Sequence, residues 1–342
     1  MDRLDERQLL DLFESPDLIA LGRAADLARQ ELHPGSIVSY VVDRNINYTN
    51  ACVSGCKFCA YFRAPGREDA FVMSMAELRG KLAEAKDLGA TQVLLQGGLH
   101  PELRLDYYRQ VLSIIKQEFG LHAHCFSPPE IAHIARVEGL GVAECLRQLQ
   151  EAGLDTVPGG GAEVLSDEIR ARVSPQKCSR QEWLGVMREA HGLGMRSTAT
   201  MMFGMGEEPR HLVEHLLSVR DLQDETSGFT AFIPWTFQSM NTALDGEVPK
   251  LGGHAYLRVL AICRLALDNI ANVQASWVTQ GAKVAQLALR FGANDMGSTM
   301  IEENVVRAAG VTFRMQREEI VRVIEAAGFE PRQRNCYYEY IE

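Results

Sequence analysis

Strand-like and helix-like segments alternate along most of the chain. Eight segments are short, apolar or β-branched and usually end in Gly, Pro or Ser, which is typical of buried strands. These expected strands begin at residues 37, 91, 122, 155, 196, 229, 273 and 294. Amphipathic segments with polar start signals lie between them. The pattern therefore predicts an α/β protein built from strand–helix units.

Local signals mark where several helices begin. Ser74 and Glu77 form a capping-box pattern, and Ser179 with Glu182 repeats it. Two helical patterns precede the first strand, at about 4–13 and 16–31, and one follows the last strand, near 316–327.

The alternation of strands and helices predicts parallel strands joined by right-handed crossovers. Eight units favour a closed (β/α)8 TIM-type barrel, with a doubly wound open sheet as the competitor. We expect an N-terminal helical extension (1–35), the barrel (36–315) and a C-terminal helix and tail packed on the barrel (316–342). In such a barrel, chemistry gathers on the loops that follow the strands.

Composition narrows the classes of partner. The net charge of −10 argues against a nucleic-acid partner. No window of about 18 residues is apolar and free of charge, and the N-terminus has no apolar signal core, so we expect no membrane insertion and a cytoplasmic location. Thiols stay reduced there, so the eight cysteines do not indicate a disulfide framework.

Three cysteines stand out in the stretch ACVSGCKFCAYFR, which begins at Ala51 and follows the first expected strand. Cys52, Cys56 and Cys59 have no fourth cysteine nearby, whereas closed zinc sites use four ligands and ferredoxin spacings also supply four. Three thiolates on a [4Fe–4S] cluster leave one iron open to bind substrate or cofactor. Zinc binding stays an alternative, as does a non-catalytic iron–sulfur electron carrier.

The pattern C-x3-C-x-F-C at the opening of a barrel resembles the radical S-adenosylmethionine (SAM) superfamily. The resemblance implies that Cys52, Cys56 and Cys59 hold a [4Fe–4S] cluster whose open iron chelates SAM, and that SAM yields a 5′-deoxyadenosyl radical. It implies further cofactor-binding residues, all at strand ends or in the cysteine loop: Tyr61, Gly97, Gly98, Ser127, Glu163 and Gly204.

Longer stretches, among them SPPEI (from Ser127), IPWTF (from Ile233) and ASWVTQG (from Ala275), resemble the branch that serves the futalosine route to menaquinone. That resemblance implies cyclisation of dehypoxanthine futalosine. A hydrogen atom leaves ribose C4′, the carbon radical adds to the benzoate ring, and loss of one electron and one proton restores aromaticity. A reductant such as flavodoxin or ferredoxin is implied as partner. A sibling that joins two substrates, such as aminofutalosine synthase or an FO synthase subunit, is the alternative.

Two residues are candidates for the proton acceptor. His124 shares one face of its strand with His122 and serves as a base if that face is inward, with a hydrogen-bonded structural histidine of the barrel as its alternative role. Glu130 is the second candidate, and capping of the following helix is its alternative role.

Overall fold

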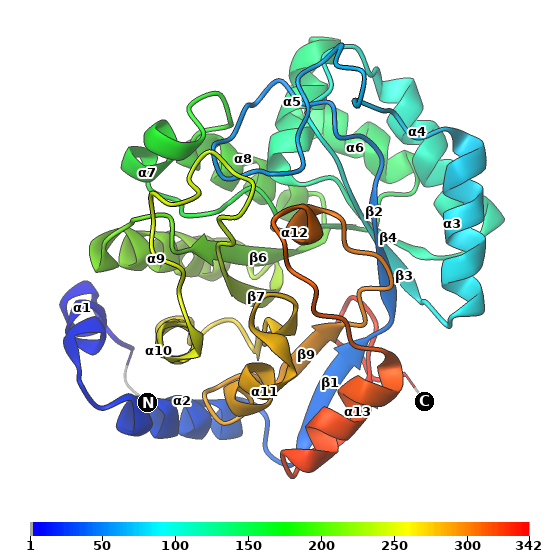
Figure 1. The fold of residues 1–342 in the computed structure, drawn as a ribbon. Helices are drawn as coiled ribbons and strands as arrows, with labels where there is room; N and C mark the ends of the chain where they lie inside the picture. The colour runs from blue at the N-terminus through cyan, green and yellow to red at the C-terminus, as the bar shows by residue number, and fades with distance from the viewer. Residues whose placement is uncertain (1–2, 342) are drawn as a thin grey trace.

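The structure, a computed structural model, describes residues 3–341, so residues 1, 2 and 342 at the outer limits of the expected extension and tail lie outside the described residues. Parallel strands form a barrel that helices surround (Figure 1). The strands are β1 (Ile37–Val41), β2 (Asp43–Asn47), β3 (Gln92–Gln96), β4 (His122–Cys125), β5 (Thr156–Val157), β6 (Arg196–Phe203), β7 (Phe229–Thr236), β8 (Asn272–Val273), β9 (Asp295–Ser298) and β10 (Glu330–Gln333).

The expected barrel is confirmed, with eight strand positions around the ring. Strands β2 to β8 pair in chain order as one parallel sheet. Strand β2 continues β1 after Val42, and β1 pairs with β9. A parallel bridge between Gln274 and Asp295 joins the end of β8 to β9 and completes the circuit.

Two strands were not expected from the sequence. The first expected strand is longer than its apolar part, because DRNIN continues it as β2 with five buried residues. The predicted polar tail also contains a strand, β10, which pairs in parallel with β1 in the register Ile37 to Glu330. Each of these polar strands pairs along its backbone with a neighbouring parallel strand, β2 with β3 and β10 with β1.

Helices fill the connections between the strands. They are α1 (Glu6–Glu14), α2 (Leu18–Leu32), α3 (Met75–Asp87), α4 (Leu105–Ser113) with the π-helical turn η1 (Ile114–Glu118), α5 (Pro128–Glu138), α6 (Val142–Ala152), α7 (Asp167–Val173), α8 (Arg180–Gly192), α9 (Pro209–Thr226), α10 (Gly253–Ala266), α11 (Trp277–Ala288), α12 (Val305–Ala308) and α13 (Arg317–Ala326). The capping boxes at Ser74 and Ser179 are both present. Within residues 3–341, no helix combines the length and apolar character that a membrane crossing requires.

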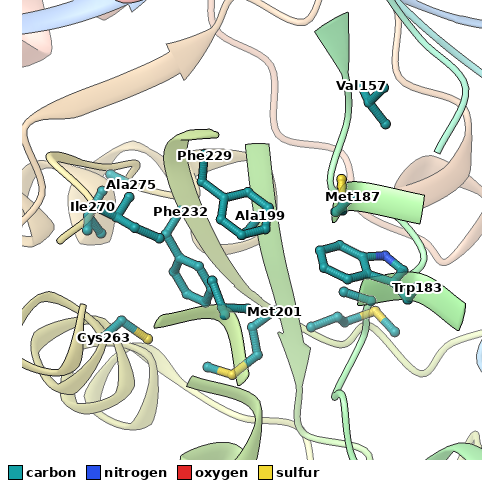
Figure 2. Close-up of a cluster of buried hydrophobic side chains, with 14 of the residues drawn as sticks. Val157, Trp183, Met187, Ala199, Met201, Phe229, Phe232, Cys263, Ile270 and Ala275 are labelled. Carbon is teal, nitrogen blue, oxygen red and sulfur yellow. The ribbon is translucent and has the colours of Figure 1, made fainter. Parts of the chain in front are cut away.

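The hydrophobic core lies between the strands and the outer helices. Figure 2 shows Trp183 and Met187 of α8 beside Phe229 and Met201 of β7 and β6. The Trp183 and Phe229 rings stack with centroids 6.3 Å apart. Alternate residues of the same strands point the other way, into the barrel, so the packed outer layer fixes which side chains face the interior.

Candidate active site

The cysteine loop begins directly after β2, at the carboxyl ends of the strands. Cys52, Cys56 and Cys59 all line one cavity of about 240 Å³, which we call the first cavity. The loop is tied to the rest of its segment by backbone hydrogen bonds, including Cys52 N–H to the Arg63 carbonyl at 2.9 Å. The predicted metal-binding residues therefore meet in one place.

Hydrogen-bond donors and a cation surround the three sulfur atoms. Cys52 Sγ accepts from the N–H of Leu99 at 3.2 Å, and Ser54 Oγ lies 3.1 Å from Cys56 Sγ. Burial raises the pKa of Cys56 to about 11, although the Lys177 ammonium works in the opposite direction. Burial also raises the pKa of Cys59. These two thiols are therefore protonated at neutral pH until a metal displaces the protons.

The donor set fits a cluster better than a single metal ion. Among residues 3–341, no three His, Cys, Asp or Glu side chains form a group that could hold one metal ion. Each thiolate of a [4Fe–4S] cluster binds a different iron, so the sulfur atoms need not converge on one point. A tetrahedral zinc site would require that convergence.

Gly97 and Gly98 follow β3 and line the same cavity. A Cβ on Gly97 would lie 2.6 Å from the Tyr48 ring, and one on Gly98 would lie 2.9 Å from Cys52 Cβ and would also collide with the Ala51 carbonyl. Glycine is therefore required here by close approach. Leu99, the next residue, contributes a backbone N–H to Cys52 Sγ.

Glu130 and Ser127 lie at the start of α5 and line the first cavity. Glu130 Oε1 accepts from the Tyr48 hydroxyl and from Gly97 N–H, both at 2.9 Å, while its other oxygen accepts from the Ser127 hydroxyl and N–H. Burial raises the pKa of Glu130, and these hydrogen bonds oppose the shift. Both oxygens are occupied, which favours the capping role over that of a base.

Glu163 lines the first cavity, and one of its carboxylate oxygens has no hydrogen-bond partner in the described part of the chain. Its backbone has the uncommon φ of +43°, and Oε1 accepts from Lys177 Nζ at 2.9 Å. Oε2 is buried without a hydrogen-bond partner, and Arg170 is 3.7 Å away. Because a buried carboxylate oxygen costs free energy when unsatisfied, this atom is suited to accept from a ligand amine or hydroxyl.

The other two predicted cofactor residues differ in position. Tyr61 lines the first cavity, and burial raises its pKa to about 12. Gly204 follows β6 but is not among the residues that line the first cavity. At the end of β6 the cavity is lined by Met202, with Phe237 beside it.

A second cavity of about 250 Å³ lies deeper in the barrel. Gln96, Gly160 and Trp235 line both cavities, so the two adjoin. Residues of α12 also line both, and this helix is drawn across the middle of the barrel in Figure 1.

The wall of the second cavity is rich in hydrogen-bond acceptors. Asp43 and Asn45 point inward from β2, and Gln92 does so from β3. Burial raises the pKa of both Asp43 and Glu303. Asn45 Oδ1 and Gln92 Oε1 are buried without hydrogen-bond partners.

Sequence reasoning missed these acceptors but identified one residue that lines the second cavity, His124. The available signal was the alternation of polar residues in DRNIN, which places Asp43, Asn45 and Asn47 on one face of a strand.

Two family models match the chain. Residues 46–219 match the radical SAM superfamily, and residues 226–342 match the CofH/MqnC C-terminal region.

Curated relatives match over almost the full length. The chain is 46% identical to cyclic dehypoxanthine futalosine synthase of Halalkalibacterium halodurans, covering 99% of this chain and 92% of the relative. The enzyme of that name from Streptomyces coelicolor is 43% identical over 99% of this chain and 86% of its own length. A 5-amino-6-(D-ribitylamino)uracil–L-tyrosine 4-hydroxyphenyl transferase from Methanopyrus kandleri is 42% identical, over 99% of this chain and 94% of its own length.

Solved structures share the fold. Methylornithine synthase (PylB) superposes with a TM-score of 0.77 at 20% identity, covering 96% of this chain and 94% of that one. The FeFe-hydrogenase maturase HydG from Carboxydothermus hydrogenoformans also superposes with a TM-score of 0.77, at 16% identity, covering 98% of this chain and 78% of that one.

Proposed function

This chain belongs to the radical SAM superfamily, and from that premise we propose that it cyclises dehypoxanthine futalosine in the futalosine route to menaquinone. The observation that carries the proposal is the near-full-length likeness, at 46% and 43% identity, to two enzymes named for that product. The adjoining cavities support it, since one reaction needs room for both a cofactor and a substrate.

Residues of the first cavity hold the cofactors in this proposal. Cys52, Cys56 and Cys59 bind the [4Fe–4S] cluster, while Lys177 places a positive charge beside its anionic thiolates. When bound, the cluster and SAM together supply a 5′-deoxyadenosyl radical that removes a hydrogen atom from the substrate.

The proposed SAM contacts divide into backbone and side-chain groups. Gly97 and Gly98 line the cavity, and their backbone is proposed to contact the methionine end of SAM. The unpaired oxygen of Glu163 accepts from an amine or a ribose hydroxyl. Tyr61 and Ser127 line the same space. Gly204, which follows β6 next to Phe237 of the cavity wall, is proposed to support the adenine side.

The second cavity is the proposed substrate chamber. Two of its acceptors, Asn45 Oδ1 and Gln92 Oε1, have no partner among the described residues and match the hydroxyl donors of a ribose. Asp43 beside them already accepts from Gln92 and Ser298. Trp235 and Trp277 offer apolar surface to the aromatic ring. Holding ribose and ring together in one chamber gives the near-attack geometry that an intramolecular addition needs.

His124 is the proposed proton acceptor because it lines the chamber. Glu130 is kept as the second candidate, and in its observed contacts it positions Gly97 and Ser127.

Flavodoxin or ferredoxin is the proposed electron donor, and the cytoplasm is the proposed location. The cysteine loop exposes Val53 and Lys57, which gives such a donor access close to the cluster.

The transferase relative supports a second candidate, the joining of two substrates, because its identity of 42% is close to that of the cyclases. Both candidates share the cluster, so SAM cleavage does not separate them. Product mass does: cyclisation lowers the substrate mass by two hydrogens, whereas transfer joins two molecules.

The experiment offers both substrate sets to the anaerobically reconstituted and reduced protein with SAM. Dehypoxanthine futalosine should give the cyclised product together with 5′-deoxyadenosine. L-Tyrosine with 5-amino-6-(D-ribitylamino)uracil should give no adduct. Adduct formation in the second reaction, without cyclisation in the first, would replace the proposed function with the transferase activity.

A further inference from the structure

A threonine hydroxyl on the barrel wall lies between two histidine rings. His124 Nδ1 is 2.7 Å from Thr156 Oγ1, and His122 Nε2 is 2.8 Å from the same oxygen. The register of β4 and β5 produces this arrangement, because His124 and Thr156 are directly paired. Cys336 Sγ lies 3.4 Å from the same oxygen, so the single hydrogen of this hydroxyl has three neighbours. In the arrangement that a relay requires, the hydroxyl donates to His122 Nε2 and accepts from His124 Nδ1.

This row of side chains joins the second cavity to solvent. His124 lines the cavity, and its Nε2 has no hydrogen-bond partner among residues 3–341. At the other end, the His122 side chain is 17% exposed and its Nδ1 lies 3.8 Å from Asp155 Oδ2. His122 opens β4, so this end lies at the amino side of the barrel, away from the cysteine loop.

Burial keeps both rings neutral. Burial lowers the pKa of His124 to about 3, and His122 and Arg334 lower it further. Burial lowers the pKa of His122 to about 4, which Asp155 opposes and Lys116 reinforces. Lys116 also bonds Asp155 at 2.7 Å. In the tautomer that carries its proton on Nδ1, the neutral His124 ring presents a free Nε2 lone pair to the cavity.

We propose that His124, Thr156 and His122 carry the substrate proton from the chamber to solvent, an inference that rests on the proposed cyclisation. A ring C–H bond of the cyclised radical breaks and its proton bonds to His124 Nε2, while an oxidised iron–sulfur cluster, which Cys52, Cys56 and Cys59 would hold, would take up the electron. The Nδ1 proton of His124 moves to Thr156 Oγ1, and the Thr156 hydroxyl proton moves to His122 Nε2. The His122 imidazolium then faces Asp155 and releases a proton to water.

Thr156→Val tests the relay because valine keeps the shape and removes the hydroxyl. Hydrogen abstraction should continue, so 5′-deoxyadenosine should form in several-fold excess over aromatised product. The rate of product formation should fall by about 10²-fold, a typical contribution of proton transfer to a positioned group. Thr156→Ser should restore the rate, the coupling and the solvent deuterium isotope effect of the parent chain.

Thr226→Val is the matched control. The Thr226 hydroxyl also bonds a histidine, His191 Nδ1 at 2.7 Å, but it lies at the end of α9 and lines neither cavity. This variant should keep the parent coupling. Equal coupling and equal isotope effects in Thr156→Val and Thr226→Val would overturn the relay.

Nuclear magnetic resonance of the cluster-free chain tests the hydrogen-bonded row without turnover, so it applies even if Thr156→Val binds its cluster poorly. In the cluster-free chain labelled with ¹⁵N-histidine, the His122 and His124 ring signals should shift together in Thr156→Val and stay fixed in Thr226→Val. Unshifted signals would refute the hydrogen-bonded row. Absence of cyclised product from the parent chain would instead refute the proposed function, so the two failures are distinguishable.

Discussion

Gly98 determines how closely the end of β3 approaches the cysteine loop. A side chain there would collide with the Ala51 carbonyl and with Cys52 Cβ. Cys52 also accepts a hydrogen bond from the next residue, Leu99. The position of Cys52, a proposed cluster ligand, therefore depends on the absence of one methyl group.

Gly98→Ala should displace the loop at a cost of about 1–3 kcal/mol, as overpacking usually does. Iron content after anaerobic reconstitution should fall well below that of the parent chain. Gly80→Ala is the control, since Gly80 lies in α3 with nothing within 4 Å of the added Cβ. It should load iron normally and gain about 0.4–1 kcal/mol of stability. Normal iron loading in Gly98→Ala would contradict this view of the loop.

Glu163→Gln tests the unpaired carboxylate oxygen. The amide keeps the size but removes the charge that faces a ligand amine and that pairs with Lys177. The Kd for SAM should rise about tenfold or more in the reconstituted protein, a loss in the range of a charge-assisted hydrogen bond. Iron content should stay at the parent level, and an unchanged Kd would remove Glu163 from the SAM site.

At the scale of elements, α9 is joined to the loop that carries Glu163 by one buried ring. His215 Nδ1 accepts from Leu165 N–H at 2.9 Å, so the ring must be neutral at that nitrogen. Burial, with Arg170 and Arg180 nearby, lowers the pKa of His215 to about 3.

Because its pKa is lowered in the folded chain, His215 makes the protein more stable as the pH rises. Between about pH 3 and 6.5 the unfolded chain binds a proton at His215 and the folded chain does not. Its contribution to stability is therefore complete above about pH 6.5 and falls by about 1.4 kcal/mol per pH unit as the pH is lowered.

Between pH 6.5 and 4.5, His215→Gln should reduce the slope of the unfolding free energy against pH by the amount that corresponds to one bound proton. Glutamine can still accept from Leu165 N–H but does not titrate there. Urea unfolding at several pH values measures the slope. His254→Gln, at an exposed position, is the control and should keep the parent slope. An unchanged slope in His215→Gln would show that the ring is not buried in its neutral form.

Features that depend on residues close together in the sequence could be predicted. Features that depend on which residues of neighbouring strands are paired could not. The capping boxes and the cysteine spacing depend on residues three or four apart, so the printed sequence contains them fully. The hydrogen bond between His124 and Thr156 depends on which residues of β4 and β5 are paired. Asp43 and Gln92 were missed because polar residues on an inward strand face resemble a loop until the barrel is known.

At the scale of the whole molecule, a buried ion pair fastens the C-terminal segment to the barrel. Arg334 contacts Asp295 of β9 through two hydrogen bonds, of 2.6 and 2.9 Å. Both side chains are almost inaccessible, at 5% and 0% exposure. The tail therefore contributes to the wall of the second cavity, which Arg334, Cys336 and Tyr338 line.

Arg334→Met should cost about 3–5 kcal/mol, because it leaves the Asp295 carboxylate buried without its partner. Arg332→Met is the matched control two residues away. Its ion pair with Glu330 is exposed and should be worth about 0–1 kcal/mol. Chemical denaturation of the two variants compares them directly, and equal losses would mean that the tail is not fastened at Arg334.

The central claim is that three thiols hold a cluster with one iron open to SAM. Low-temperature electron paramagnetic resonance of the anaerobically reconstituted and reduced protein tests it most directly, with and without SAM. We expect a [4Fe–4S]⁺ signal that SAM changes, and Cys56→Ala should lack this response. A cluster signal that SAM leaves unchanged, or a reconstituted parent chain without a cluster, would contradict the account.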